Sequence, residues 1–173
     1  TSTLRWLGNT LDITSLRVPV ATLHRLPRFK PSGKQGPILP GFDIRIGSLS
    51  IKRLAIGPGI VGKARNGTLS GRADIRSGRA LIDLNVDAAE GDRLVLNLDA
   101  EPDRNKFDVK ADLSAPSGGV FGAILGTLRP VSAKIDGDGS WKDWRGTLNA
   151  NVSGVPIAQL SLAALDGHYL TNG

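Results

Sequence analysis

Alternation of apolar and polar residues with a period of two is the feature of this 173-residue sequence that most constrains its fold. In LIDLNVDA, residues 81–88, Ile82, Leu84 and Val86 fall on one side and polar residues fall on the other. Such alternation is typical of antiparallel strands that have one dry and one solvated face. The same pattern recurs at residues 42–51, 93–100, 106–115, 131–141, 144–154 and 158–162. The sequence therefore predicts a mostly β fold.

Turn-forming residues separate these strands at short, regular intervals. The predicted turns are Asn66-Gly67, Ser77-Gly78, Glu90-Gly91-Asp92, Pro102-Asp103-Arg104-Asn105 and Ser153-Gly154. This spacing predicts one antiparallel meander, forming a single domain over residues 1–173. Residues 27–41 hold four prolines and three glycines, which predicts a loop. The preceding residues, 11–26, alternate and predict one or two strands, with Pro19 at an edge or a bend.

One segment has helical spacing. Residues 117–128 carry apolar side chains at intervals of three and four, and Ser117 stands where an N-cap is expected. Four glycines within the segment weaken the helix, since each interior glycine costs about 1 kcal/mol relative to alanine. We expect a short apolar helix that packs on the sheet, and a simple cap is favoured over a lipid-inserting element.

GPGIVGKA, residues 57–64, resembles a nucleotide-binding P-loop. Gly57, Gly62 and Lys63 fit the pattern, but Ala64 replaces the magnesium-binding hydroxyl and Pro58 lacks an amide hydrogen. A P-loop also needs a following helix whose N-terminus binds phosphate, whereas a turn and an alternating strand are predicted here. The glycine pattern of a dinucleotide site fails for the same reason. The sequence therefore predicts no nucleotide binding.

No other motif carries catalytic or metal chemistry. Asp136, Asp138 and Ser140 fit the start of a calcium loop, but Trp141 and Thr147 occupy its glycine and glutamate positions, so a polar hairpin turn is favoured. The chain has no cysteine, which excludes disulfides and thiol catalysis, and its two histidines are far apart. No nucleophile lies in a motif with a base. We expect no cofactor, no metal and no enzymatic activity, with a hydrolase as a distant alternative.

The charge of the chain, +6 overall, is uneven. Residues 1–63 carry a net charge of +8 and residues 64–173 a net charge of −2. A basic first third predicts either a solvated face or a surface for anionic lipid or an acidic partner. We expect no nucleic-acid partner, because few aromatic residues accompany the basic ones. Because the chain contains no methionine, we expect a fragment or a processed form. The longest apolar stretch in the sequence is too short to span a bilayer.

The long apolar face of the predicted meander leaves two possibilities. In a closed sandwich or barrel it would be the core, and in an open, curled sheet it would line a groove. Aromatic residues make up 5% of the chain and glycine occurs 22 times, so large side chains for filling a closed core are few. This composition slightly favours the groove.

Several motifs occur in an order that resembles the TamB family of large AsmA-like proteins. They are RLP at 25–27, IGSLSIKRLAIG at 46–57, GTLSG at 67–71, APSGG at 115–119 and DGDGSWKDWRGTLNANVSGVPIAQLSL at 136–162. The resemblance implies an N-proximal periplasmic fragment of a protein anchored in the inner membrane of a Gram-negative bacterium. The implied fold is a β-taco with an apolar concave face. The implied role is phospholipid transport toward the outer membrane, supporting outer-membrane biogenesis and protein secretion or assembly.

The resemblance implies a site on the inward face of each strand. It implies no catalytic residue in this sequence. The predicted lipid-groove residues are Phe42, Ile44, Ile46, Ile82, Leu84, Val86, Leu94, Leu96, Leu98, Phe107, Val109, Leu113, Val131, Ile135, Leu148, Val152, Leu160 and Leu162. The implied partners are phospholipid acyl chains and a TamA-like outer-membrane barrel, the latter reached through regions mostly outside this segment. The alternative is a structural or protein-interaction domain whose apolar face is sealed.

Overall fold

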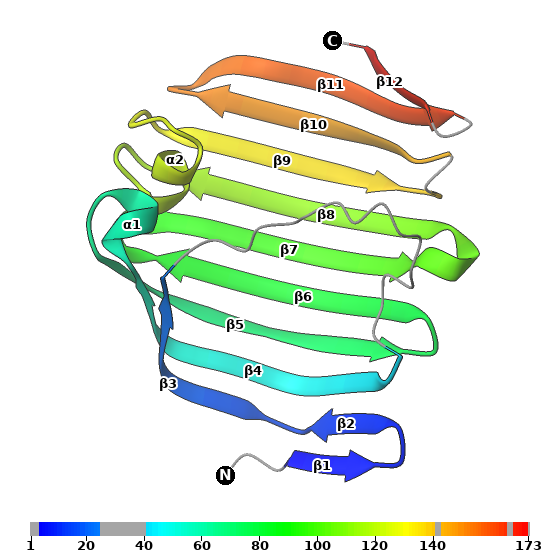
Figure 1. Ribbon diagram of the computed structural model, residues 1–173. Helices are drawn as coiled ribbons and strands as arrows, with labels where there is room; N and C mark the ends of the chain where they lie inside the picture. Colours follow the sequence, from blue (N-terminus) through cyan, green and yellow to red (C-terminus); the bar gives the residue numbers. More distant parts are fainter. Residues whose placement is uncertain (1–3, 25–40, 141–142, 166–167, 173) are drawn as a thin grey trace.

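The computed structural model is one open β-sheet of twelve strands that does not close on itself (Figure 1). It describes residues 4–24, 41–140, 143–165 and 168–172. The strands are β1 (Leu4–Leu7), β2 (Thr10–Ile13), β3 (Leu16–Leu23), β4 (Asp43–Ile56), β5 (Arg65–Arg76), β6 (Arg79–Ala88), β7 (Asp92–Glu101), β8 (Lys106–Ala115), β9 (Val131–Asp138), β10 (Arg145–Val152), β11 (Val155–Leu165) and β12 (His168–Asn172). The mostly β fold predicted from the alternation is confirmed.

From β4 to β12 the sheet is the predicted antiparallel meander, and each strand pairs with the next one along the chain. The first strands depart from it, because β2 and β3 both pair with β4 in parallel. Parallel neighbours need a long connection, which the chain has between Leu23 and Asp43. Pro19 lies in β3, which pairs only with β4, so the predicted edge position is confirmed.

The helices are short and lie at one end of the strands, the left end in Figure 1. These two helices are α1 (Pro58–Val61) and α2 (Val120–Ile124). Two single 3-10 turns, η1 (Ala89–Gly91) and η2 (Pro102–Arg104), join neighbouring strands. The helix predicted over 117–128 is thus present but covers only five residues. Within the part of the chain that the structure describes, no helix is long and apolar enough to cross a membrane.

Two sequence predictions about this end of the sheet are wrong. Asn66 and Gly67 lie inside β5 instead of in a turn, because the chain reverses earlier, through α1. Ser117 is not the N-cap of α2, since the left-handed Gly118 (φ 68°) and Gly119 delay the helix to Val120. The Ser117 hydroxyl instead donates to the Leu128 carbonyl at 2.9 Å.

The other predicted turns and motifs can be placed directly. Ser77-Gly78 and Ser153-Gly154 form tight turns, and Pro102 to Asn105 form η2 and its cap. Arg65 begins strand β5 directly after Ala64, so no helix N-terminus follows the P-loop-like segment. The predicted loop at 27–41 lies almost entirely outside the described residues.

The sheet curls toward its apolar face, and backbone features set the curvature. Register shifts in β4 mark β-bulges between Ile46 and Leu49 and between Ile51 and Leu54. Bulges bend a strand and increase its twist. Opposite the first bulge, Gly71 is in register with Leu84, and a Cβ added at Gly71 would collide with the Asp83 carbonyl oxygen. The neighbouring backbone therefore approaches on the apolar side, and only glycine fits there.

Candidate functional site

The register of the strands assembles one continuous apolar face. Leu84 lies opposite Leu96, which lies opposite Ala111, and directly opposed residues point to the same side of a sheet. The row continues through three more strands as Ile135, Leu148 and Leu160. With neighbouring strands about 4.8 Å apart, this row of six strands is about 24 Å long.

Most of the predicted groove residues lie on this face. The register places on it Ile44, Ile46, Ile82, Leu84, Val86, Leu94, Leu96, Leu98, Phe107, Val109, Leu113, Val131, Ile135, Leu148, Val152 and Leu160. Leu162 lies in β11 opposite Gly146. Phe42 precedes the first residue of β4 and is 37% exposed, so it is not part of the paired face.

The prediction missed the second half of β4, where Leu49, Ile51, Leu54 and Ile56 also join the apolar face. The two bulges each insert an extra residue and shift the alternation, so strict period-two counting fails there. Similarly, Leu11 and Ile13 of β2 join the face through their pairing with β4. That pairing is parallel and long-range, and no local pattern predicts it.

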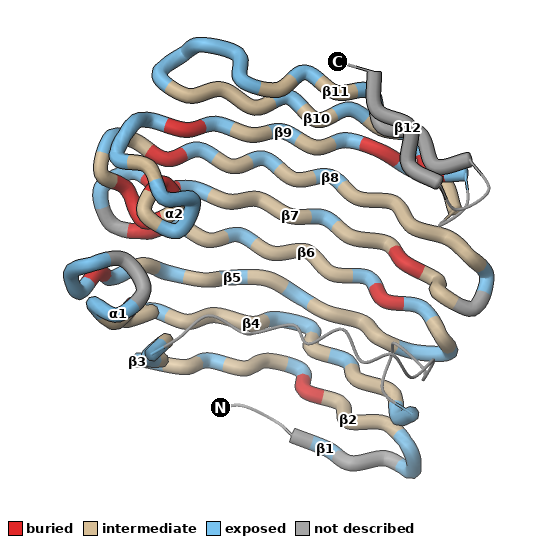
Figure 2. The backbone as a smooth tube through the Cα atoms, turned by 45° about the horizontal axis from the view of Figure 1, so that its top comes forward, coloured by how far each residue is buried: buried red, intermediate tan, exposed pale blue. Residues whose placement is uncertain are grey.

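On the apolar face, residues in the middle of the strands are half-buried, and the fully buried ones lie near the strand ends. Leu84, Leu96 and Ile135 have intermediate exposure, whereas Ala80, Ala88 and their equivalents at strand ends are buried (Figure 2). In a sealed core such leucines would be almost fully buried. Among the described residues, α2 covers one end of this face through Val120, and Trp144 covers the other end. Within the described part of the chain, the face is therefore an open, concave surface along the middle of the strands.

A hollow of about 500 Å³ lies over β4–β7. Four of its lining residues form one cross-strand row of the apolar face: Ile46, Ala73, Ile82 and Leu98. Arg45, Arg72, Asp74 and Asp83 also line the hollow, although the register places these four on the polar face, so the hollow involves residues of both faces.

One rim of the apolar face is closed by α2, which a buried carboxylate holds in place. Val120 is 2% exposed and packs with Ile56 and Ala88. Asp92, at 1% exposed, accepts hydrogen bonds from the backbone N–H groups of Val120 (2.7 Å) and Phe121 (2.9 Å). A carboxylate so placed satisfies two amides that a helix start leaves without partners. No local sequence pattern predicts this contact, because 28 residues separate Asp92 from Val120.

Arg65 is the second buried charge at this rim. Its guanidinium donates to the Gly118 carbonyl at 2.7 Å and forms an ion pair with Glu90. The hydrogen bond that Arg65 donates to Glu90 lowers the pKa of the Glu90 carboxyl below its usual value. Glu90 has a φ of 76°, in the region that favours glycine, so the turn is held in an uncommon conformation while it reaches Arg65. Arg65 thereby links η1 to the segment that precedes α2.

At the opposite rim an aromatic pair covers the strand ends. Trp144 is 8% exposed and its ring centroid lies 6.3 Å from that of Phe107. The indole lies over Gly137 and Gly146, where any Cβ would collide with the ring. The Trp144 ring therefore packs directly on the backbone of these two glycines, which explains why glycine interrupts the alternation of β9 and β10.

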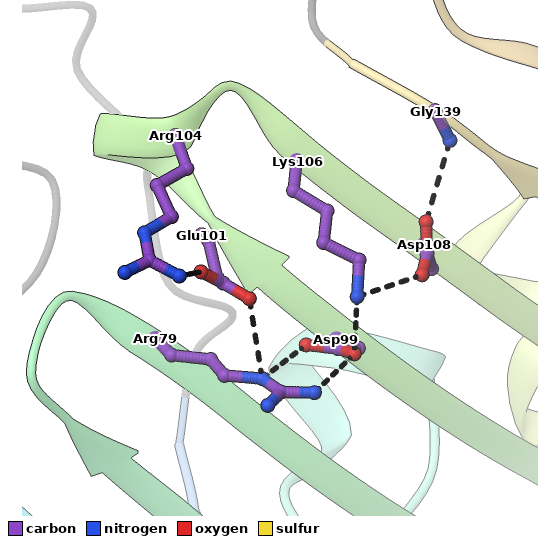
Figure 3. A network of polar contacts seen from close by, with 7 residues as sticks. All are labelled: Arg79, Asp99, Glu101, Arg104, Lys106, Asp108 and Gly139. Carbon is purple, nitrogen blue, oxygen red and sulfur yellow. Dashed lines mark hydrogen bonds and ion pairs between the residues drawn. The ribbon is translucent and has the colours of Figure 1, made fainter.

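The other face of the sheet is polar and carries cross-strand ion pairs. Asp99 accepts hydrogen bonds from Arg79 at 2.7 and 2.8 Å and from Lys106 at 2.9 Å (Figure 3). Chiefly because of the Arg79 hydrogen bonds, the pKa of Asp99 is lowered to about 2. Lys106 also pairs with Asp108 at 3.3 Å, so the network joins β6, β7 and β8. Its role is to fix the register of these strands on the solvated side.

The remaining charged residues singled out from the sequence have structural neighbours. Asp136 of the calcium-like stretch lies in β9 and pairs with Lys110 at 3.6 Å. In the basic first third, Arg45 lies 3.9 Å from Asp12 and Lys63 lies 3.9 Å from Glu90. Among the described residues, no group of three or more His, Cys, Asp or Glu side chains could hold a metal ion.

Comparisons with protein-family models, with curated proteins and with solved structures find no match. The resemblance to the TamB family therefore stays a prediction that rests on the sequence motifs alone.

Proposed function

We propose that the concave apolar face binds the acyl chains of phospholipids and that the chain is a lipid-conducting segment of a TamB-like protein. The observation that carries this proposal is the row of aliphatic side chains across the middle strands, which no other described residue buries completely. An acyl chain in one bilayer leaflet spans about 15 Å, half of the hydrocarbon core. The 24 Å row can therefore hold such a chain along its whole length.

The chemistry of binding would be the transfer of methylene groups from water to leucine, isoleucine and valine side chains. Each buried CH₂ contributes about 0.8 kcal/mol. Because the row of aliphatic side chains crosses six strands, an acyl chain could move along it from strand to strand without entering water. Head groups would remain at the solvent-exposed rims. This transport needs neither a nucleotide nor a catalytic residue.

The place of this segment in a cell follows from the same proposal. In a TamB-like protein it would lie in the periplasm of a Gram-negative bacterium, between an inner-membrane anchor and an outer-membrane barrel resembling TamA. Contact with that barrel would involve other regions of the protein. Phospholipid transport along the groove would then support outer-membrane biogenesis. Fractionation of the producing cells tests the location, and recovery of the protein in the cytoplasmic fraction would contradict it.

The decisive experiment is native mass spectrometry of the purified protein, with lipid extraction in parallel. Leu148→Asp places a charge on the apolar face, and Asn149→Asp places the same charge on the polar face, opposite Lys134. We expect phospholipid to co-purify with the wild type and with Asn149→Asp. We expect it to be lost from Leu148→Asp while the circular dichroism spectrum remains that of a β protein.

Two results would contradict the groove. One is a lipid-free wild type that binds no fluorescent fatty acid. The other is unfolding of Leu148→Asp, because a charge in a sealed core costs several kcal/mol. Either result would favour the sealed structural domain.

A further inference from the structure

The loop that carries α2 has an unusual surface. We define it as the rim loop, residues 116–130. Three of its aliphatic side chains face solvent: Ile124 is 38% exposed, Leu125 61% and Leu128 75%. Across the neighbouring hairpin, Val155 is 61% exposed, and the Ser153 amide donates to the Pro130 carbonyl at 2.8 Å. The exposed aliphatic residues of the two segments therefore lie at the same rim.

The rim loop holds these side chains out on a fixed backbone. Gly118 N–H and the Ser117 hydroxyl both donate to the Leu128 carbonyl at 2.9 Å, which closes the loop at its base. Inside the loop the amides of Ala123, Leu125, Gly126 and Thr127 donate to loop carbonyls. Asp92 and Arg65 anchor the loop to the sheet. The exposed aliphatic groups are thus preorganised, with no ordering of the backbone needed on binding.

The chemistry of the loop fits the surface of an anionic bilayer. Residues 116–128 contain no charged side chain, and the internally bonded amides lower the cost of placing the backbone at the edge of the hydrocarbon. Arg129 follows Leu128 directly and is exposed, and among the described residues no carboxylate forms an ion pair with it. Lys63, on the adjacent α1 segment, is also largely exposed. Exposed aliphatic groups flanked by basic groups are typical of membrane-surface binding.

A protein partner fits the loop less well. Protein interfaces draw most of their binding energy from Trp, Tyr and Arg, with leucine under-represented. Apart from Arg129, the exposed large side chains of the rim loop are Ile and Leu. We propose that the rim loop inserts Leu125 and Leu128 into the surface of an anionic membrane, so that this rim of the sheet rests on the bilayer. This contact is independent of lipid bound in the groove.

Co-sedimentation with vesicles tests the rim loop. The wild type is mixed with vesicles of phosphatidylethanolamine and phosphatidylglycerol, and in parallel with phosphatidylcholine vesicles. Each exposed leucine contributes about 1.5 kcal/mol when buried, so Leu125→Ser/Leu128→Ser lowers partitioning about a hundredfold. Arg129→Gln lowers it about fivefold on anionic vesicles and leaves it unchanged on phosphatidylcholine. Val20→Ser, at a residue 55% exposed on β3, is the matched control and leaves partitioning unchanged.

Three outcomes would overturn the proposal. They are a wild type that does not sediment with anionic vesicles, a double variant that sediments like the wild type, and a leucine-dependent dimer in light scattering. The last would show that a second copy of the chain covers the loop. The test is separable from that of the groove. Leu148→Asp should still bind vesicles, and the loop double variant should still co-purify with phospholipid.

Discussion

The cap on α2 gives a prediction whose size can be worked out from two hydrogen bonds. Asp92→Asn keeps one side-chain oxygen, which still accepts from one amide, but turns an NH₂ group toward the other. Of the two bonds, at 2.7 and 2.9 Å, one is thus lost and a buried N–H is left facing a donor. A hydrogen bond to a charged group contributes about 1.5–3 kcal/mol. We expect Asp92→Asn to destabilise the attachment of α2 by about 2 kcal/mol.

Hydrogen exchange measured by NMR at the Val120 and Phe121 amides is the assay for this change. Since 1.4 kcal/mol corresponds to a factor of ten, their protection should fall about thirtyfold. Amides in the centre of β7, such as that of Leu96, serve as internal controls and should change by less than threefold. Protection at Val120 and Phe121 that stays within threefold of the wild type would refute the reasoning. It would mean that packing of Val120, rather than the carboxylate, holds α2.

Three further predictions concern the sheet itself. Gly71→Ala should cost about 1–3 kcal/mol in urea unfolding because its methyl meets a backbone carbonyl, whereas Gly59→Ala, with open space around it, should change stability by less than 0.5 kcal/mol. Trp144→Ala should cost about 3 kcal/mol, and an effect no larger than that of the exposed Leu128→Ala would contradict its packing role. The folded pKa of Asp99, about 2, lies below its ordinary 3.8, so its ion pairs stabilise the fold fully above about pH 5, and this stabilisation is lost as the pH falls through 2 to about 1. After allowance for solvent screening, Asp99→Asn should cost about 1 kcal/mol at pH 5 and almost nothing at about pH 1, and a cost independent of pH would contradict the assignment.

Period-two alternation predicted the meander and most of the apolar face, because each side chain in a half-buried strand reports its own side of the sheet. The same rule failed in β4, where bulges at Gly47-Ser48 and Lys52-Arg53 change the side on which later residues lie. Local propensity also misled at Asn66-Gly67, since glycine serves there as a contact point with β6 rather than as a turn. A glycine within a strand pattern therefore has two meanings that sequence does not separate.

The features that the sequence did not predict depend on contacts between residues far apart along the chain. The parallel pairing of β2 and β3 with β4 depends on where the chain returns after Leu23. Asp92 was predicted as a turn residue, yet it is the buried cap of a helix 28 residues away. The packing of Trp144 on Gly137 and Gly146 likewise depends on the pairing of β9 with β10. Spacing along the chain carries no information on such contacts.

An open apolar face requires that the sheet keep its shape without a second layer packed on that face. Here the curvature is set by bulges and by glycines such as Gly71, and the register is reinforced by ion pairs on the polar side, such as Arg79 with Asp99. Neither device uses the side chains in the middle of the apolar face. In the proposed groove those side chains would be free to contact a mobile ligand, and exchange among Leu, Ile and Met should alter stability little. A groove built in this way would select for chain-like apolar ligands in general, rather than for one lipid species.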